Sequence, residues 1–196
     1  MLKVYGHVTS INVRKVLWMC DELGEPFERT DKAGDRNPVG LVPVIEDGAA
    51  VIWESNVIVR YLATSRGRED LAPKDPVARA HVEQWMDFQA SDFNNSWRVA
   101  FQALVRKKLA FQDKAAIAAS ITQWNHMVGI IDRQLARTGA FIAADHFTMA
   151  DIVIGLSIHR WRAAPIEHPQ YARVDAYYEQ LLGRPGFLRY GRDGGP

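Results

Sequence analysis

Residues 37–56 read NPVGLVPVIEDGAAVIWESN and predict a β-hairpin followed by a helix. Two apolar runs, 42–45 and 50–53, flank an Asp-Gly pair at 47–48, and this pair is typical of tight hairpin turns. The letters ESN at 54–56 precede apolar residues that recur with a period of about 3.6, so a helix begins there. The stretch therefore supplies two antiparallel strands and a following helix.

The segment before the hairpin predicts a parallel βαβ unit. Residues 2–5 form a short apolar run, and a helical pattern begins near Ser10 and stops at Gly24, a residue type that ends helices. Residues 27–30 can form a second strand, parallel to the first. Residues 31–40 are polar and rich in turn residues, so the helix before the hairpin is shortened or missing.

The sequence changes character after the hairpin and its helix. Residues 66–74 are charged and contain glycine and proline, as linkers do, while Asp75 and Pro76 are residue types that begin helices. Downstream, the periodicity predicts helices at about 76–108, 113–137, 149–163 and 169–183. The predicted fold is α+β: a β-α-β-β-β-α domain at 1–65, a linker at 66–74 and an all-helical domain at 75–196.

The bulk composition is that of an ordinary globular protein with a real core, since 47% of the 196 residues are hydrophobic and 24% are charged. The net charge of +1 provides no general field for nucleic acid or an anionic membrane. The lone Cys20 excludes an intrachain disulfide, and the N-terminus lacks the apolar run of a signal peptide. We therefore expect a cytoplasmic protein with no nucleic-acid or membrane partner.

Three motifs, in their order and spacing, resemble the cytosolic glutathione transferase family. They are NPVGLVPVIEDG at 37–48, WESNVIVRYLA at 53–63 and FTMADI at 147–152. The resemblance covers nearly the whole chain and is to the serine-type, bacterial theta- or nu-like members. It implies a thioredoxin-like first domain that binds glutathione, a helical second domain that shapes the pocket for a small electrophile, and a role in detoxification. It also implies a homodimer, which the sequence itself does not show.

The resemblance implies a glutathione site around Pro43 and the start of the next helix. In the family the matching proline is cis, which turns the backbone of Val42 outward to pair with the glutathione peptide. Glu54 and Ser55 match the pair that holds the γ-glutamyl end, and free N–H groups at a helix start do bind anions. Without the flanking motifs, Pro43 would be an ordinary edge-strand proline, and Glu54 and Ser55 would be capping residues.

Ser10 is the residue expected to activate glutathione. It lies where the loop after the first strand meets the first helix, so its hydroxyl can donate to a sulfur seated over the helix N-terminus. It matches the activating serine or threonine of the family, and Asn12 matches an asparagine that some bacterial members use as a second donor. Thr9 is the neighbouring alternative, and a simple helix cap is the alternative without a ligand.

The region before the Val-Pro pair departs from the family. The stretch 31–42 is shorter than usual and has little room for the helix that helps to hold the glycine end of glutathione. The frequent family lysine before the Val-Pro pair is Leu41 here. Lys32, Arg36 or Asn37 would then have to bind the glycine carboxylate, so we expect weak glutathione affinity and an open pocket.

The second-substrate pocket is expected on the long helix after the linker. Aromatic and apolar residues recur there at spacings of three and four, a stripe that is core packing by default. Because this helix borders the electrophile pocket in the family, Trp97 and Phe101 are the candidate residues. Arg98 and Arg106 could favour an acidic substrate, although a solvated helix face is the simpler interpretation.

Three further features are interpreted as structural. Thr148 and Asp151 form a capping box at a helix start rather than a catalytic pair. Cys20 lies almost three turns from Ser10 along one helix and fills the core. The six histidines form none of the spacings typical of a metal site, so no metal is expected.

The predicted activity is glutathione addition or substitution at an electrophilic carbon, with glutathione as co-substrate and no covalent nucleophile on the protein. One alternative is a binding or interaction protein that keeps the fold without transferase activity. A second is glutathione-dependent peroxidase, dehalogenase or isomerase chemistry, which uses the same thiolate and differs in the helical pocket.

Overall fold

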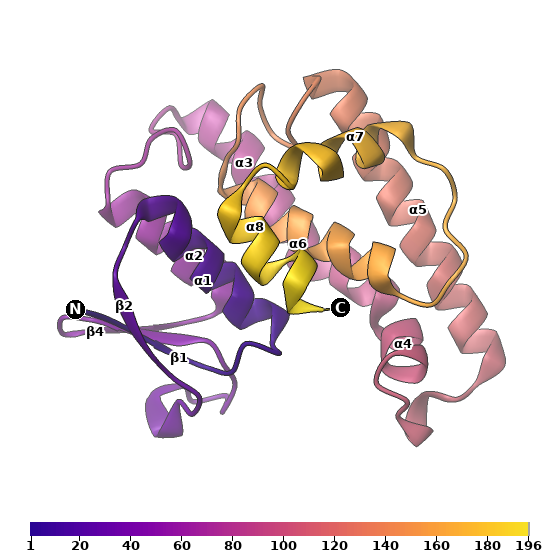
Figure 1. The fold of residues 1–196 in the computed structure, drawn as a ribbon, viewed down its shortest axis with the longest axis horizontal. Helices are drawn as coiled ribbons and strands as arrows, with labels where there is room; N and C mark the ends of the chain where they lie inside the picture. The colour runs from indigo at the N-terminus through magenta and orange to yellow at the C-terminus, as the bar shows by residue number, and fades with distance from the viewer. Residues whose placement is uncertain (196) are drawn as a thin grey trace.

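The structure is a computed structural model that describes residues 1–195 (Figure 1). Its first part is a four-stranded sheet in the order β2-β1-β3-β4, built from β1 (Leu2–Tyr5), β2 (Phe27–Thr30), β3 (Val44–Asp47) and β4 (Ala50–Trp53). β1 pairs with β2 in parallel, whereas the β1–β3 and β3–β4 pairs are antiparallel. The predicted βαβ unit and hairpin are both confirmed.

Two helices accompany this sheet, α1 (Ile11–Leu23) and α2 (Ser55–Ser65). α1 ends at Gly24, whose φ of 61° is the left-handed conformation that glycine adopts without strain. Between β2 and β3 the chain forms only a short 3-10 turn at Gly34–Arg36. The shortening predicted for this region is therefore present in the structure.

The rest of the described chain is helical. Its helices are α3 (Pro76–Phe88), α4 (Asn94–Leu104), α5 (Lys114–Thr138), α6 (Met149–Ala163), α7 (Ala172–Leu181) and α8 (Pro185–Tyr190). Figure 1 shows α5 on the far side of the helical part from the sheet, with α6 and α8 between them. Across residues 1–195, every helix is too short or too polar to serve as a membrane span.

Two predicted helices differ from the structure, and one helix was not predicted. The helix expected over 76–108 is interrupted by a π turn at Gln89–Phe93 and stops at Leu104. The helix expected over 169–183 begins at Ala172, because its first amides, of Arg173 and Val174, are capped by the Asp132 carboxylate of α5. Such a cap comes from a distant element and leaves no local signal. The six-residue α8 is missed because so short a helix carries little periodicity.

α6 is the central helix of the molecule and contacts α1, α2, α3, α7 and α8. Its apolar stretch at 152–158 is buried throughout, as predicted. α1 docks on this helical part through Trp18, which is fully buried. A Cβ added at Gly186 would lie 2.3 Å from Trp18 Cδ1, so only glycine permits the close approach of α8. This packing fixes α1 relative to α6.

The segment between α2 and α3 is packed rather than loose. Leu71 and Ala72 are 1% and 4% exposed, and the amide of Met149 donates to the Leu71 carbonyl over 3.1 Å. The connection therefore runs along the start of α6 and helps to hold the sheet and the helices together. The division of the chain at this segment stays a prediction.

Candidate functional site

A cavity of about 500 Å³ opens between the start of α1 and the helices α4 and α6. It is lined by His7, Thr9, Ser10, Ile11, Asn12, Leu41, Val42, Trp97, Phe101, Gln102, Arg106, Lys108 and Arg160. In Figure 1 the start of α1 points toward the side of the molecule where α4 lies. The structure thus brings together five of the predicted site residues, Ser10, Asn12, Val42, Trp97 and Phe101, from both parts of the chain.

Ser10 is the N-cap residue of α1, but its hydroxyl makes no capping hydrogen bond. Its backbone is extended (φ −84°, ψ 120°), and its carbonyl accepts the first helical bond from the Arg14 amide over 3.0 Å. The first amides of an α-helix have no partner within the helix and carry its positive dipole end. A free hydroxyl therefore lies beside an electropositive helix start on the cavity wall.

The chain before β3 is held against the start of α1 at Gly6. Gly6 has a φ of 141°, and a Cβ built there would lie 2.4 Å from Val13 Cγ2 and 3.0 Å from Val42 Cβ. Glycine is the residue that permits this approach. The Val42–Pro43 bond is cis, as the family resemblance implies, and Val42 lies half-buried at the cavity edge.

The start of α2 carries an unusual backbone conformation. Glu54, its N-cap, has φ 71° and ψ 113°, a left-handed φ that is uncommon for a residue with a Cβ. Its exposed carboxylate makes no capping bond, while the adjacent Ser55 is only 5% exposed. Because strained backbone of this kind concentrates at ligand sites, the outlier supports a binding role for Glu54.

The opposite wall of the cavity is aromatic and cationic. The rings of Trp97 and Phe101 meet edge to face with centroids 5.3 Å apart. The guanidinium carbon of Arg160, from α6, lies 4.6 Å from the Trp97 centroid and 4.3 Å from that of Phe101. Burial, with repulsion from Arg14 and Arg106, lowers the pKa of Arg160 to about 9, so it stays charged at neutral pH.

Comparison with known proteins assigns the chain to a protein family. The family model for the glutathione S-transferase N-terminal domain matches residues 9–65, and that for the C-terminal domain matches residues 114–180. Glutathione S-transferase GstB of Escherichia coli K12 is 32% identical over 198 residues, which cover 94% of this chain and 95% of GstB. The chain belongs to the glutathione S-transferase family.

Solved structures agree with this assignment. The theta-class glutathione S-transferase of Xanthomonas axonopodis pv. citri, with glutathione bound, is 36% identical, with a TM-score of 0.89 over 97% of this chain and 96% of that one.

A further sequence relative is elongation factor 1-gamma 1 of Oryza sativa, which is 28% identical over 158 residues that cover 78% of this chain but 37% of that protein. The predicted family and the thioredoxin-like fold of its first domain are confirmed.

Lys15 lies behind the start of α2, next to Ser55 and Asn56, and sequence reasoning misses it. It is 1% exposed, and its Nζ donates to Gln89 Oε1 (2.7 Å) and Asn56 Oδ1 (3.0 Å), with Ser55 Oγ at 3.5 Å. Burial lowers the pKa of Lys15 to about 7. The available signal was a pair of cations, Arg14 and Lys15, inside an otherwise apolar helical run.

Arg160 is also missed, although it lines the cavity beside Trp97 and Phe101. In the sequence it ends an apolar helix and has no local partner that suggests a site. Its cavity neighbours come from α4, about sixty residues earlier in the chain. Only the folded structure places its guanidinium beside the rings of Trp97 and Phe101.

The residues predicted to hold the glycine end of glutathione do not line the cavity. Arg36 donates to the carboxylate of Glu46 and is committed to that ion pair. Asn37 is 6% exposed, and its side chain donates to the Leu41 carbonyl over 2.8 Å, which shapes the loop. Lys32 is exposed and outside the cavity. The structure therefore gives these three residues no common ligand-facing position.

The alternatives to Ser10 differ in their surroundings. Thr9 Oγ1 lies 2.6 Å from His7 Nδ1, so the two side chains share a hydrogen bond. Asn12 lines the cavity with a half-buried side chain. Of the two neighbouring hydroxyls, that of Ser10 is the one left without a capping or side-chain bond.

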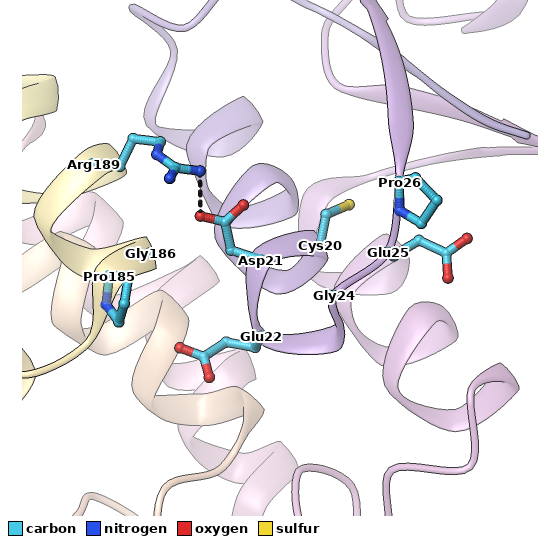
Figure 2. Close-up of a pocket in the computed structure, with 9 residues that line it drawn as sticks. All are labelled: Cys20, Asp21, Glu22, Gly24, Glu25, Pro26, Pro185, Gly186 and Arg189. Carbon is cyan, nitrogen blue, oxygen red and sulfur yellow. Dashed lines mark hydrogen bonds and ion pairs between the residues drawn. The ribbon is translucent and has the colours of Figure 1, made fainter.

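A second cavity, of about 410 Å³, lies at the opposite end of α1 (Figure 2). There Arg189 of α8 reaches to Asp21 of α1 and forms an ion pair at 2.8 Å. Burial raises the pKa of Cys20 to about 12, so its thiol stays protonated and offers no nucleophile. Cys20 is a buried core residue, as predicted. Within residues 1–195, no cluster of three or more His, Cys, Asp or Glu side chains could hold a metal ion.

Proposed function

We propose that the protein is a glutathione transferase that activates the glutathione thiol at the start of α1 and directs it to a small hydrophobic electrophile. The observation that carries the proposal is the free Ser10 hydroxyl at an open helix start on a cavity wall. The similarity to GstB and to the glutathione-bound theta-class structure, over nearly the whole chain, supports it.

The energetics require the Ser10 hydroxyl. A thiol with a pKa of about 8.5 is only a few per cent ionised at neutral pH, and lowering that pKa by about two units requires ~2.7 kcal/mol. A helix dipole supplies ~0.3–1 kcal/mol, and a hydrogen bond to a charged group supplies ~1.5–3 kcal/mol. The dipole is insufficient alone, so Ser10 donates to the sulfur and stabilises the thiolate.

The γ-glutamyl end of glutathione lies at the start of α2 in this proposal. Its carboxylate meets the free amides of the helix start and the Ser55 hydroxyl, while Glu54 faces its ammonium group. Lys15 lies behind Ser55, with Nζ 3.5 Å from Ser55 Oγ, and in its protonated form adds positive potential on the carboxylate side. The strained Glu54 backbone holds the carboxylate of that side chain out for the ligand.

The backbone of Val42 pairs with the peptide of glutathione, beside the cis Pro43. The glycine end is held weakly, because Arg36 and Asn37 already use their polar groups within the protein. Release of Arg36 from Glu46 would provide a cation at the cost of an ion pair. The weak affinity predicted from the short 31–42 segment follows from this arrangement.

The chemistry is attack of the thiolate on an electrophilic carbon. The sulfur forms a bond to that carbon, a leaving group departs or a double bond takes up the electron pair, and the thiol proton passes to solvent. Trp97 and Phe101 supply the apolar surface for the electrophile. No protein nucleophile takes part.

The wider organisation follows the family. Residues 1–65 form the glutathione-binding domain, 66–74 the connection, and 75–196 the domain that completes the electrophile pocket. Two copies of the chain associate as a homodimer, and the enzyme acts in the cytoplasm in detoxification. Size-exclusion chromatography with light scattering tests the dimer, and the expected molar mass is that of two chains.

Ser10→Ala tests the proposal directly. Conjugation of chlorodinitrobenzene should slow at least about tenfold in kcat, because the hydroxyl stabilises the thiolate. The Kd for glutathione, measured by calorimetry, should change little. Ser10→Thr, which keeps a hydroxyl, is the control and should retain most of the activity. An unchanged kcat in Ser10→Ala would transfer the role to Asn12 or Thr9.

A non-catalytic function is the second candidate, because part of elongation factor 1-gamma also matches this chain. A binding protein of this kind would take up glutathione without conjugating chlorodinitrobenzene. Peroxidase, dehalogenase or isomerase chemistry is separated by substrate: the thiolate would then turn over a hydroperoxide, a haloalkane or an isomerisable double bond faster than the aryl halide.

A further inference from the structure

The electrophile side of the cavity is positively charged and contains no carboxylate. Arg106, Lys108 and Arg160 are basic, and none of the lining residues is Asp or Glu. Arg14 is buried nearby, and its charge and that of Arg106 both act on Arg160. A concave wall of one charge attracts and concentrates ligands of the opposite charge.

Arg160 is buried without an acceptor. It is 4% exposed, and its Nε has no hydrogen-bond partner within residues 1–195. The Nε of the nearby buried Arg14 is also unpartnered within residues 1–195, but its Nη1 donates to the carbonyls of Tyr190 (3.1 Å) and Gly195 (2.6 Å). A charged side chain this deeply buried is stabilised by an anionic partner, and an anion in the cavity that Arg160 lines would supply one.

The neighbours of Arg160 suit an anion attached to a flat, apolar body. The guanidinium carbon lies close to the rings of both Trp97 and Phe101, so an anion bound by Arg160 would also have apolar aromatic surface beside it. Trp97 Nε1 is a second buried donor without an acceptor within residues 1–195. Arg106 extends this wall toward solvent, 5.5 Å from the Phe101 centroid.

We propose that the electrophile of this enzyme carries a carboxylate, which Arg160 binds while the glutathione sulfur attacks elsewhere on the substrate. This inference rests on the proposed transferase function. With a chloronitrobenzoate, the sulfur bonds to the carbon that bears chlorine, chloride leaves with the bonding electron pair, and the thiol proton goes to solvent. Arg160 touches the carboxylate and not the reacting atoms, so it determines specificity.

A matched substrate pair tests the inference. A chloronitrobenzoate and the corresponding chloronitrobenzamide have the same reacting carbon and nearly the same shape, but only the first is charged. The wild type should show a KM for the benzoate at least about tenfold lower, since a hydrogen bond to a charged group is lost with the amide. Arg160→Met should raise the benzoate KM at least about tenfold and the benzamide KM less than about threefold.

Two controls separate charge from structure. Arg160→Lys keeps the cation and should recover part of the benzoate preference, whereas Arg98→Met removes an exposed arginine of α4 outside the cavity and should change neither KM. The Kd for glutathione should be the same in Arg160→Met as in the wild type. If it weakens as much as benzoate binding does, Arg160 serves glutathione and the inference is wrong.

Binding measurements keep this inference distinct from the transferase proposal. Calorimetry with nitrobenzoate and nitrobenzamide, which have no leaving group, reports the anion preference whether or not conjugation occurs. Failure to conjugate either chloro compound, with nitrobenzoate still preferred, would contradict the transferase function only. Equal binding of the two ligands by the wild type would overturn the anion site.

Discussion

The helices α1 and α6 both have a hydroxyl residue as N-cap. Only at α6 do the polar side chains of the helix start form hydrogen bonds with one another and with the backbone. At α6 the amide and the hydroxyl of Thr148 donate to Asp151 Oδ2 over 2.8 and 3.1 Å. The other oxygen of Asp151 accepts from the Ile142 amide (2.9 Å) and the Tyr177 hydroxyl (3.0 Å). At α1 the hydroxyl of Ser10 caps nothing, and the first turn contains no acid.

This difference separates a structural helix start from one that can receive a ligand. Thr148 and Asp151 are fully buried and paired, so their role is to organise the helices, as the predicted capping box implies. Ser10 is half-buried beside a cavity, and its hydroxyl makes no capping bond to the helix amides. Changes at α6 should therefore affect stability, and changes at α1 should affect catalysis.

Loss of the Asp151 carboxylate should have the largest effect. Asp151→Ala leaves several buried donors without an acceptor, so the free energy of unfolding should fall by about 2–4 kcal/mol. Ser10→Ala should change it by less than about 0.5 kcal/mol. Urea unfolding measures both values. A fully stable but inactive Asp151→Ala protein would contradict the structural role of α6.

The two helix starts should also differ in pH dependence. Burial raises the pKa of Asp151 to about 6, above its ordinary value of 3.8, so the folded state binds this proton more tightly than the unfolded state. Its contribution to stability is full below the unfolded pKa and is lost as the pH rises through the folded one. The free energy of unfolding of the wild type, relative to Asp151→Asn, should fall by roughly 1–3 kcal/mol between pH 4 and 7.

The control for this titration is Ser10→Ala, which should follow the wild type at every pH because no acid lies in the first turn of α1. Unfolding by urea at several pH values provides the comparison. A constant difference between the wild type and Asp151→Asn would show that burial does not control this carboxyl group.

The smallest effects come from the two hydroxyls themselves. Thr148→Val removes one buried hydroxyl that donates to Asp151 and should cost about 1 kcal/mol of stability, while turnover stays within about twofold. Ser10→Ala should show the reverse, with little loss of stability and a large loss of turnover. Thermal unfolding and conjugation assays on both variants measure these opposite effects on stability and turnover. Parallel losses in both properties would remove the distinction between the helix starts.

Local patterns in the sequence predict most of the fold. The hairpin at 42–53, the βαβ unit and the start of α6 each depend on neighbouring residues, so a pattern read along the chain is sufficient. The start of α7 could not be predicted, because its cap, Asp132, is about forty residues away. The close contact between Gly186 and Trp18 could not be predicted either, because the two residues are far apart in the sequence.

Site residues that belong to a sequence motif could be predicted. Those whose position depends on tertiary packing could not. Ser10 and Val42 stand in recognisable motifs and do line the cavity. Arg36 is a reasonable cation in the sequence, but its partner Glu46 comes from the neighbouring strand β3. Lys15 and Arg160 were missed because their environments are built by α2, the π turn at Gln89–Phe93 and α4, which a single sequence does not bring together.

The most direct test of the account is the pKa of the glutathione thiol while it is bound. Ultraviolet difference spectroscopy follows the thiolate as pH is varied, in the wild type and in Ser10→Ala. If Ser10 stabilises the thiolate, the pKa of bound glutathione lies about two units below the free value of about 8.5 in the wild type and at least about one unit higher in Ser10→Ala. Equal pKa values in the two proteins would contradict it.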